Sequence, residues 1–200
     1  MTRRPVAQTH ILRRSPAREP RKRLLVVCGG RQTEPDYVNG LRRHLRNPAV
    51  SVDVLARDRS PSQVVQYAIT RSSQAPDSYD EVWCVVDVDQ FTDLDEAVKL
   101  AARSTTGSMS ITVAVSNPCF EFWLLLHFAE HRGHIGSYAQ LKPLLARHVS
   151  TYNKSRIDFA DYASRYPDAV ERARNLDPSG ENHRLNPSTN VWRLVTAMGG

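Results

Sequence analysis

Short apolar runs alternate with helical patterns over the first two thirds of the sequence, and this alternation constrains the fold more than any other feature. Residues 24–28 form a continuous apolar run and residues 81–88 are of the same kind, which is typical of strands buried on both faces. Two more strands are predicted at 51–57 and 111–115, and helices at 34–46, 61–73, 93–103 and 118–130. This order predicts an α/β fold in which helices flank a mainly parallel, four-stranded sheet.

The two ends of the sequence differ from this alternating region. Residues 1–22 show no hydrophobic period, contain three prolines and hold many basic residues, so they are predicted to be a disordered arm. Their charge can engage phosphate backbones or an acidic partner surface, or simply keep the protein soluble. From about residue 138 only helical patterns remain, over 138–148, 157–175 and 187–198. They are predicted to be a helical extension of one domain spanning 23–198.

Composition argues against several classes of protein. No run approaches the ~20 apolar residues of a membrane span, and residues 1–23 lack the hydrophobic stretch of a secretory signal. Cys28, Cys84 and Cys119 fit neither a disulfide framework nor the spacing of a zinc site. We therefore expect a cytoplasmic protein without a membrane segment, whose cysteines are small buried hydrophobes.

The clearest functional signal is an aspartate pair at a strand end, in VWCVVDVDQF. Strand alternation places Asp87 and Asp89 on one face, so both carboxylates can point at one site. A divalent cation relieves their repulsion, and oxygen ligands with substrate phosphates suit Mg²⁺ or Mn²⁺. In the alternative interpretation, Asp87 caps the following helix and Asp89 is solvated.

A glycine-containing loop follows the first predicted strand, in LLVVCGGRQTEPDY. Gly29 and Gly30 allow the backbone to approach a phosphate, and the helix opened by Glu34 adds a favourable dipole. The loop is not a P-loop, because no G-K-[ST] follows it. Glu34 is either a ligand of the site or an acid that complements the helix dipole.

Two Asn-Pro motifs, NPCFE at 117–121 and NPSTN at 186–190, repeat one pattern. Asn117 and Asn186 are predicted helix N-caps with proline at the first helical position. Each motif presents a polar residue four places on, Glu121 or Asn190. Glu121 comes one place too late for a capping box and precedes an apolar run, where an unpaired charge is costly. A site role is therefore predicted for Glu121.

Two further residues are candidates for the site. His127 ends the apolar helix and is either a core residue or a supporting one, whereas Lys154, in TYNKSRIDF, is either a phosphate ligand or an ordinary surface lysine. Asn117, Asn186 and Asn190 are candidates for phosphate contacts or for supporting the metal ligands. No G-x-S-x-G elbow or Cys-His arrangement indicates nucleophilic catalysis.

Taken in order, CGGRQTEPDYVNGL, VVDVDQF, SNPCFEFWLLLHF, YNKS and NPSTNVWRLV resemble the RloB-like family over about residues 23–198. That family is similar to the Toprim superfamily, the α/β fold of topoisomerases, primases and OLD-type nucleases. The resemblance implies a Mg²⁺-dependent nuclease-like domain from prokaryotic restriction or anti-phage loci, often beside an ATPase partner. Asp87 and Asp89 would hold the metal, Glu34 and Glu121 would complete or flank the site, and nucleic acid would be the substrate.

One position departs from the Toprim pattern, which has a glutamate directly after the first strand. Here Gly29 follows Cys28, although a side chain at that position is expected to face Asp87 and Asp89. Either the activity is weakened or lost, or Glu34 substitutes, or position 29 differs from the natural residue. The predicted function is a metal-dependent nuclease, and the alternative is a non-catalytic nucleic-acid-binding or regulatory subunit of a defence complex.

Overall fold

The computed structural model describes residues 21–75, 78–88 and 91–200. Most of the predicted basic arm, and the predicted metal ligand Asp89, lie outside the described residues. Within the described part of the chain, no helix is long and apolar enough to cross a membrane.

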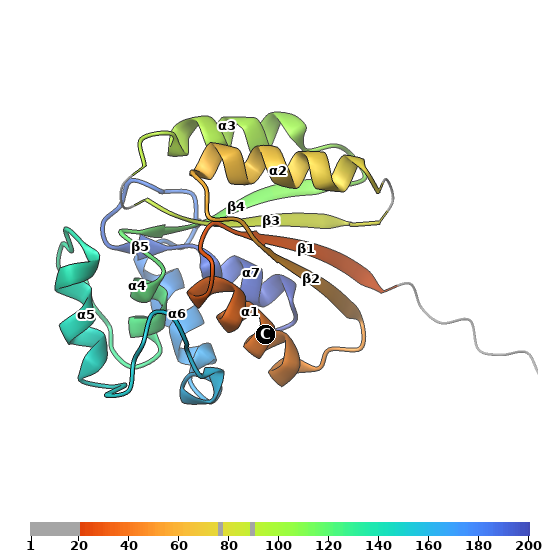
Figure 1. Ribbon diagram of the computed structural model, residues 1–200. Coiled ribbons are helices and arrows are strands. Elements are labelled where there is room, and N and C mark those ends of the chain that lie inside the picture. The colour runs from red at the N-terminus through yellow and green to blue at the C-terminus, as the bar shows by residue number, and fades with distance from the viewer. Residues whose placement is uncertain (1–20, 76–77, 89–90) are drawn as a thin grey trace, which may run out of the picture.

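A five-stranded, mainly parallel sheet forms the centre of the molecule, in the order β2-β1-β3-β4-β5 (Figure 1). The parallel strands are β1 (Lys22–Cys28), β2 (Val50–Ala56), β3 (Glu81–Asp87) and β4 (Ser110–Asn117). The predicted α/β fold and its four parallel strands are thus confirmed. The fifth strand, β5 (Ser188–Thr189), pairs antiparallel with the end of β4. This strand was not predicted, because two residues are too few to show a periodicity in the sequence.

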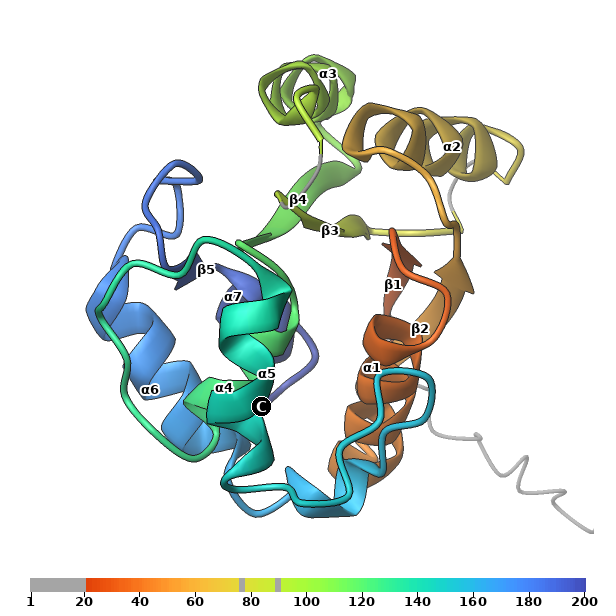
Figure 2. The ribbon, with the colours of Figure 1, turned by 60° about the vertical axis from the view of Figure 1, so that its left-hand side comes forward.

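Helices cover both faces of the sheet (Figure 2). One face carries α2 (Pro61–Ser73) and α3 (Leu94–Ser104). The other carries α1 (Thr33–Leu45), α4 (Glu121–Leu126), α5 (Tyr138–Ala146), α6 (Tyr166–Leu176), α7 (Val191–Ala197) and the 3₁₀ turn η1 (Phe159–Asp161). The helix predicted at 157–175 is therefore η1 followed by α6, and the one predicted at 187–198 is β5 followed by α7.

Alternation along β1 explains why the run at residues 24–28 is apolar throughout. Leu24, Val26 and Cys28 enter the larger core beside α1 and α4, whereas Leu25 and Val27 enter the smaller core beneath α2 and α3. Every side chain of this run is removed from water, and a fully buried large aliphatic side chain contributes about 1.5–3 kcal/mol. Residues of α5, α6 and α7 belong to the larger core, so the C-terminal helices pack on the same sheet.

The parallel strands bring their carboxyl ends to one edge of the sheet. Cys28 lies beside Val85, and Asp87 lies beside Ser116, one residue before the end of β4. The loops after β1, β2 and β3 therefore start close together, which is where open α/β sheets bind ligands.

Candidate active site

A pocket of 480 Å³ lies at this edge of the sheet. Its walls come from the loop after β1, the loop after β2, the end of β3 and the segment at Lys154 and Ser155. Five residues singled out in the sequence line it together: Gly29, Gly30, Glu34, Asp87 and Lys154. A larger hollow of 660 Å³ lies between α1 and residues 149–162, and none of the predicted site residues lines it.

Gly30 is needed for the position of Glu34 in this pocket. A Cβ at Gly30 would overlap the Glu34 carboxylate, so only glycine lets that side chain fold back over the loop. Burial raises the pKa of Glu34, and the nearby charge of Glu121 raises it further, while backbone hydrogen bonds and Lys154 act in the opposite direction. A buried acid with a raised pKa that lines a pocket is suited to accept or donate a proton.

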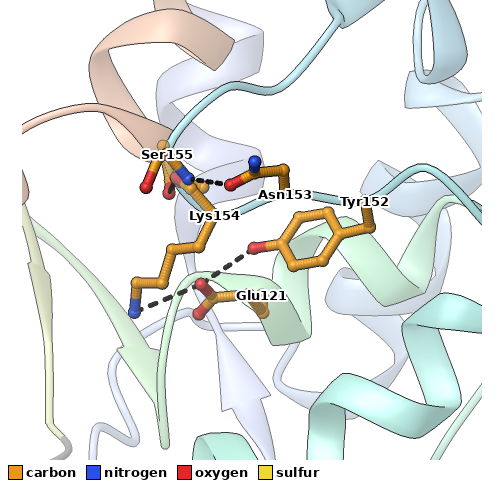
Figure 3. A network of polar contacts seen from close by, with 6 residues as sticks. Glu121, Tyr152, Asn153, Lys154 and Ser155 are labelled. Carbon is orange, nitrogen blue, oxygen red and sulfur yellow. Dashed lines mark hydrogen bonds and ion pairs between the residues drawn. The ribbon is translucent and has the colours of Figure 1, made fainter.

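Glu121, the first residue of α4, anchors the segment that carries Lys154 (Figure 3). Its side chain is only 1% exposed, and Oε1 accepts a hydrogen bond from the Tyr152 hydroxyl at 3.0 Å. The same oxygen lies 3.3 Å from the Lys154 ammonium, and the Thr33 hydroxyl donates to the Lys154 carbonyl at 2.7 Å. Lys154 is therefore tied at both its backbone and its side chain.

Lys154 carries a positive charge close to two acidic residues, Glu121 and Asp87. Partial burial acts to lower its pKa, but the charges of Glu121 and Asp87 outweigh it and raise the pKa overall. Half of the side chain stays exposed, and its ammonium lies 4.7 Å from the centre of the Tyr138 ring. A cation held in this way stays protonated at neutral pH and can contact a phosphate that enters the pocket.

The Asn-Pro motifs do not act as predicted. The N-cap of α4 is Phe120, whereas Asn117 ends β4, and both Asn-Pro bonds are cis. The Asn186 amide donates to the Asn117 side-chain oxygen at 3.0 Å and exchanges two hydrogen bonds of 2.9 Å with the backbone of Ile135. The predicted capping is wrong because the two asparagines are used to join the motifs to each other.

Asn190 has no hydrogen-bonding capacity left for a phosphate. Its oxygen accepts from the Val115 N–H at 2.5 Å, and its amide donates to the carbonyls of Val113 and Gly180 at 3.2 and 2.8 Å. An amide offers two N–H donors and one oxygen, and all three are bonded to the backbone. Asn190 thus fastens the C-terminal segment to β4.

His127 belongs to the core rather than to the pocket. The residue is fully buried, and its Nδ1 lies 3.0 Å from the Trp123 carbonyl. Because a carbonyl only accepts, Nδ1 carries the proton, and Nε2 accepts the hydrogen bond of 2.9 Å from the Tyr37 hydroxyl. Burial lowers the pKa of His127 to about 3, so the ring is neutral.

The direction of a side chain at position 29 also differs from the expectation. A Cβ at Gly29 would lie 3.7 Å from Val86 Cγ1, on the face that Val27 and Val86 share. Alternation along β3 sends Asp87 to the opposite face. Position 29 lines the same pocket as Asp87, but only the outer part of a long side chain there would meet it.

Two cations that line the pocket, Arg31 and Arg59, were not predicted from the sequence. Arg31 forms an exposed ion pair of 2.6 Å with Asp58. Arg59 makes no hydrogen bond or ion pair with other residues of the described ranges. Both follow parallel strands by three residues, so the rule that pointed to Asp87 was sufficient to find them.

The residues present are of the kind that a divalent cation prefers, although no complete site lies within the described residues. Among these residues, no three His, Cys, Asp or Glu side chains are grouped closely enough to hold a metal ion. Asp87 and Glu34 line the pocket, and the buried Oε2 of Glu121 has no hydrogen-bond partner in the described part of the chain. These are oxygen donors, as Mg²⁺ or Mn²⁺ requires, and the predicted second ligand, Asp89, is not described.

Comparison with known proteins gave one result. A family model described as RloB-like protein matches residues 24–198, which include every described residue of the pocket. No curated protein and no solved structure matches.

Proposed function

Because the chain belongs to the RloB-like family, we propose that it is a metal-dependent nuclease of the Toprim type, which cleaves phosphodiester bonds of nucleic acid. The observation that carries this proposal is the composition of one pocket. A carboxylate at a strand end, Asp87, and a buried acid, Glu34, line it with three basic residues: Arg31, Arg59 and Lys154. Cations bind the phosphate backbone, while carboxylates are needed for metal and proton chemistry.

We assign each residue a role from its chemistry and, for the described residues, from its surroundings. Asp87 and Asp89 would hold Mg²⁺ or Mn²⁺, which when bound neutralises a phosphodiester and promotes ionisation of water. Lys154 and Arg59 would orient the phosphate, since both line the pocket and carry a positive charge. Glu34 takes up the proton of the attacking water, because its raised pKa makes it a better base than an exposed carboxylate.

A second function is favoured by one observation, the glycine at position 29. Without the glutamate that the Toprim pattern places there, the chain can retain phosphate binding and lose cleavage. It would then be a nucleic-acid-binding or regulatory subunit of a phage-defence complex. An ATPase partner fits either proposal.

Binding of Mn²⁺, measured by isothermal titration calorimetry, tests the metal site independently of cleavage. Changing Asp87 and Asp89 together to Asn is expected to weaken binding at least about tenfold, since both proposed anionic ligands are lost. The control is the Glu96→Gln/Glu171→Gln pair, which neutralises two exposed carboxylates on α3 and α6. Equal Mn²⁺ binding by the Asp double variant and the parent protein would contradict the proposal of a metal site in this pocket.

A further inference from the structure

Phe91 is the only large hydrophobic side chain that is exposed among the described residues, with 43% of its surface in contact with solvent. A single exposed phenylalanine needs no special explanation on its own. Its position points to a functional role, because Phe91 lines the same pocket as Arg31, Arg59, Lys154 and Asp87.

The backbone and the ring of Phe91 suit a contact with a ligand. Its N–H donates to the Val88 carbonyl at 3.0 Å, which ties the residue to the end of β3, directly after Asp87. Tyr37, by contrast, packs edge-on against five neighbouring rings in the core. Phe91 makes no such contact with any aromatic ring in the described ranges, so an incoming flat group would meet an unoccupied surface.

We propose that Phe91 is a stacking platform for an unpaired nucleobase, and that the pocket therefore takes single-stranded nucleic acid. This inference rests on the proposed function, since it assumes that the three basic residues hold a nucleic-acid phosphate. An aromatic ring beside phosphate-binding cations is the combination by which proteins hold single strands. At 480 Å³ the pocket is the size of a small-molecule site, which suits one nucleotide unit.

The strand preference follows from what each contact can recognise. Phosphate contacts from arginine and lysine are common to single strands and duplexes. In a duplex each base is paired and stacked, so it reaches a protein ring only after extrusion, at an energetic cost. Phe91 therefore discriminates by base accessibility, while Arg59 and Lys154 do not.

Fluorescence anisotropy without added metal separates these contacts. The probes are a labelled mixed-sequence single strand, a blunt hairpin duplex and a labelled mononucleotide. Phe91→Ala and Phe91→Leu are expected to weaken single-strand binding roughly 5- to 100-fold and to leave duplex binding within about twofold. Phe91→Trp, which keeps a π face, should bind the strand at least as well as the parent protein.

Arginine variants supply the matched controls. Arg59→Ala should weaken binding to both strand forms and flatten the salt dependence, whereas Arg103→Ala, an exposed arginine on α3, should do neither. Unchanged single-strand binding by Phe91→Ala would overturn the inference. Parent-like binding by Phe91→Leu would also overturn it, because apolar contact alone would then suffice. Binding of the mononucleotide but not of the strand would identify a free nucleotide as the occupant.

Failure of this inference can be told apart from failure of the proposed nuclease. If single-strand binding depends on Phe91 but the protein cleaves no substrate, the stacking role of Phe91 is supported and the nuclease proposal is contradicted. If metal-dependent cleavage is equal on single strands and duplexes and is unaffected by Phe91→Ala, the nuclease proposal is supported and the stacking role of Phe91 is contradicted.

Discussion

Gly29→Glu is expected to raise metal-dependent cleavage about 10²- to 10⁴-fold over the parent protein, the range typical of one general acid/base group. Position 29 shares a pocket with Asp87, Glu34 and Lys154. A carboxylate added there would supply the proton acceptor or the metal ligand that the Toprim pattern has and this sequence lacks. Cleavage is measured with Mg²⁺ or Mn²⁺ on labelled single strands.

The backbone at Gly29 permits this change. Its φ lies outside the left-handed region, so a side chain causes no backbone strain of that kind. An added Cβ would lie 3.2 Å from the Val85 carbonyl oxygen, which requires a shift of a few tenths of an ångström. Because that Cβ starts above Val86, the flexible end of the glutamate must carry the carboxylate into the shared pocket.

Two variants control for this gain. Gly29→Gln has nearly the same shape without the charge and should show no increase. Gly29→Glu combined with Asp87→Asn should lose the increase, because the added group would act together with Asp87. If Gly29→Glu folds and binds Mn²⁺ but cleaves no faster than Gly29→Gln, the binding-subunit function is favoured.

His127 is expected to contribute strongly to the pH dependence of stability between pH 6 and pH 4. The folded protein keeps the ring neutral because burial lowers its pKa to about 3, whereas the unfolded chain takes up a proton near the ordinary value of about 6.5. This stabilisation is complete above the unfolded pKa and is lost as pH falls toward the folded pKa. One proton corresponds to about 1.4 kcal/mol per pH unit, or about 2.5 kcal/mol over this range.

Urea unfolding at a series of pH values measures this contribution. His127→Gln keeps a donor and an acceptor for Trp123 and Tyr37, so it should be less stable at pH 7 but show a flatter slope below pH 6. His134→Gln, at an exposed histidine, should retain the parent slope. A parent-like slope for His127→Gln would mean that His127 does not titrate between the folded and unfolded states.

The sheet could be predicted from the sequence because burial on both faces requires continuous apolar strands. The runs at 24–28 and 81–88 became β1 and β3, the central neighbours that bring Gly29 and Asp87 together. The same logic pointed to Glu34, which lies in the first turn of α1 just after the loop that follows β1 and lines the pocket. In open α/β sheets ligands bind outside the carboxyl ends of the strands, so recognising a strand in the sequence also indicates where site residues lie.

The roles of the buried polar residues could not be predicted in this way. Asn117 and Asn186 are 69 residues apart, so nothing local indicated that their side chains bond to each other. Asparagine before proline is typical of a helix N-cap, but in the folded protein both side chains are used in hydrogen bonds between distant segments. His127 is another example, because its two hydrogen-bond partners are visible only in the packed core.

The site role predicted for Glu121 stays a prediction, and its contacts were not indicated by the sequence. An acid before an apolar run suggested a paired charge, and Lys154 is that partner. The contact depends on the chain returning to the start of α4 after α5, which no sequence pattern indicated. Tyr152 and Thr33, which complete the anchoring, carried no signal beyond their polarity.

The most direct test of the proposed function is cleavage of a mixed panel by the purified parent protein. The panel contains single-stranded DNA, duplex DNA, messenger-like RNA and transfer RNA, incubated with Mn²⁺ or Mg²⁺, with and without an ATPase partner. We expect slow cleavage of at least one single-stranded or unpaired substrate, which ceases with EDTA and in the Asp87→Asn variant. If neither the parent protein nor Gly29→Glu cleaves any substrate, although both bind metal and nucleic acid, the nuclease proposal is contradicted.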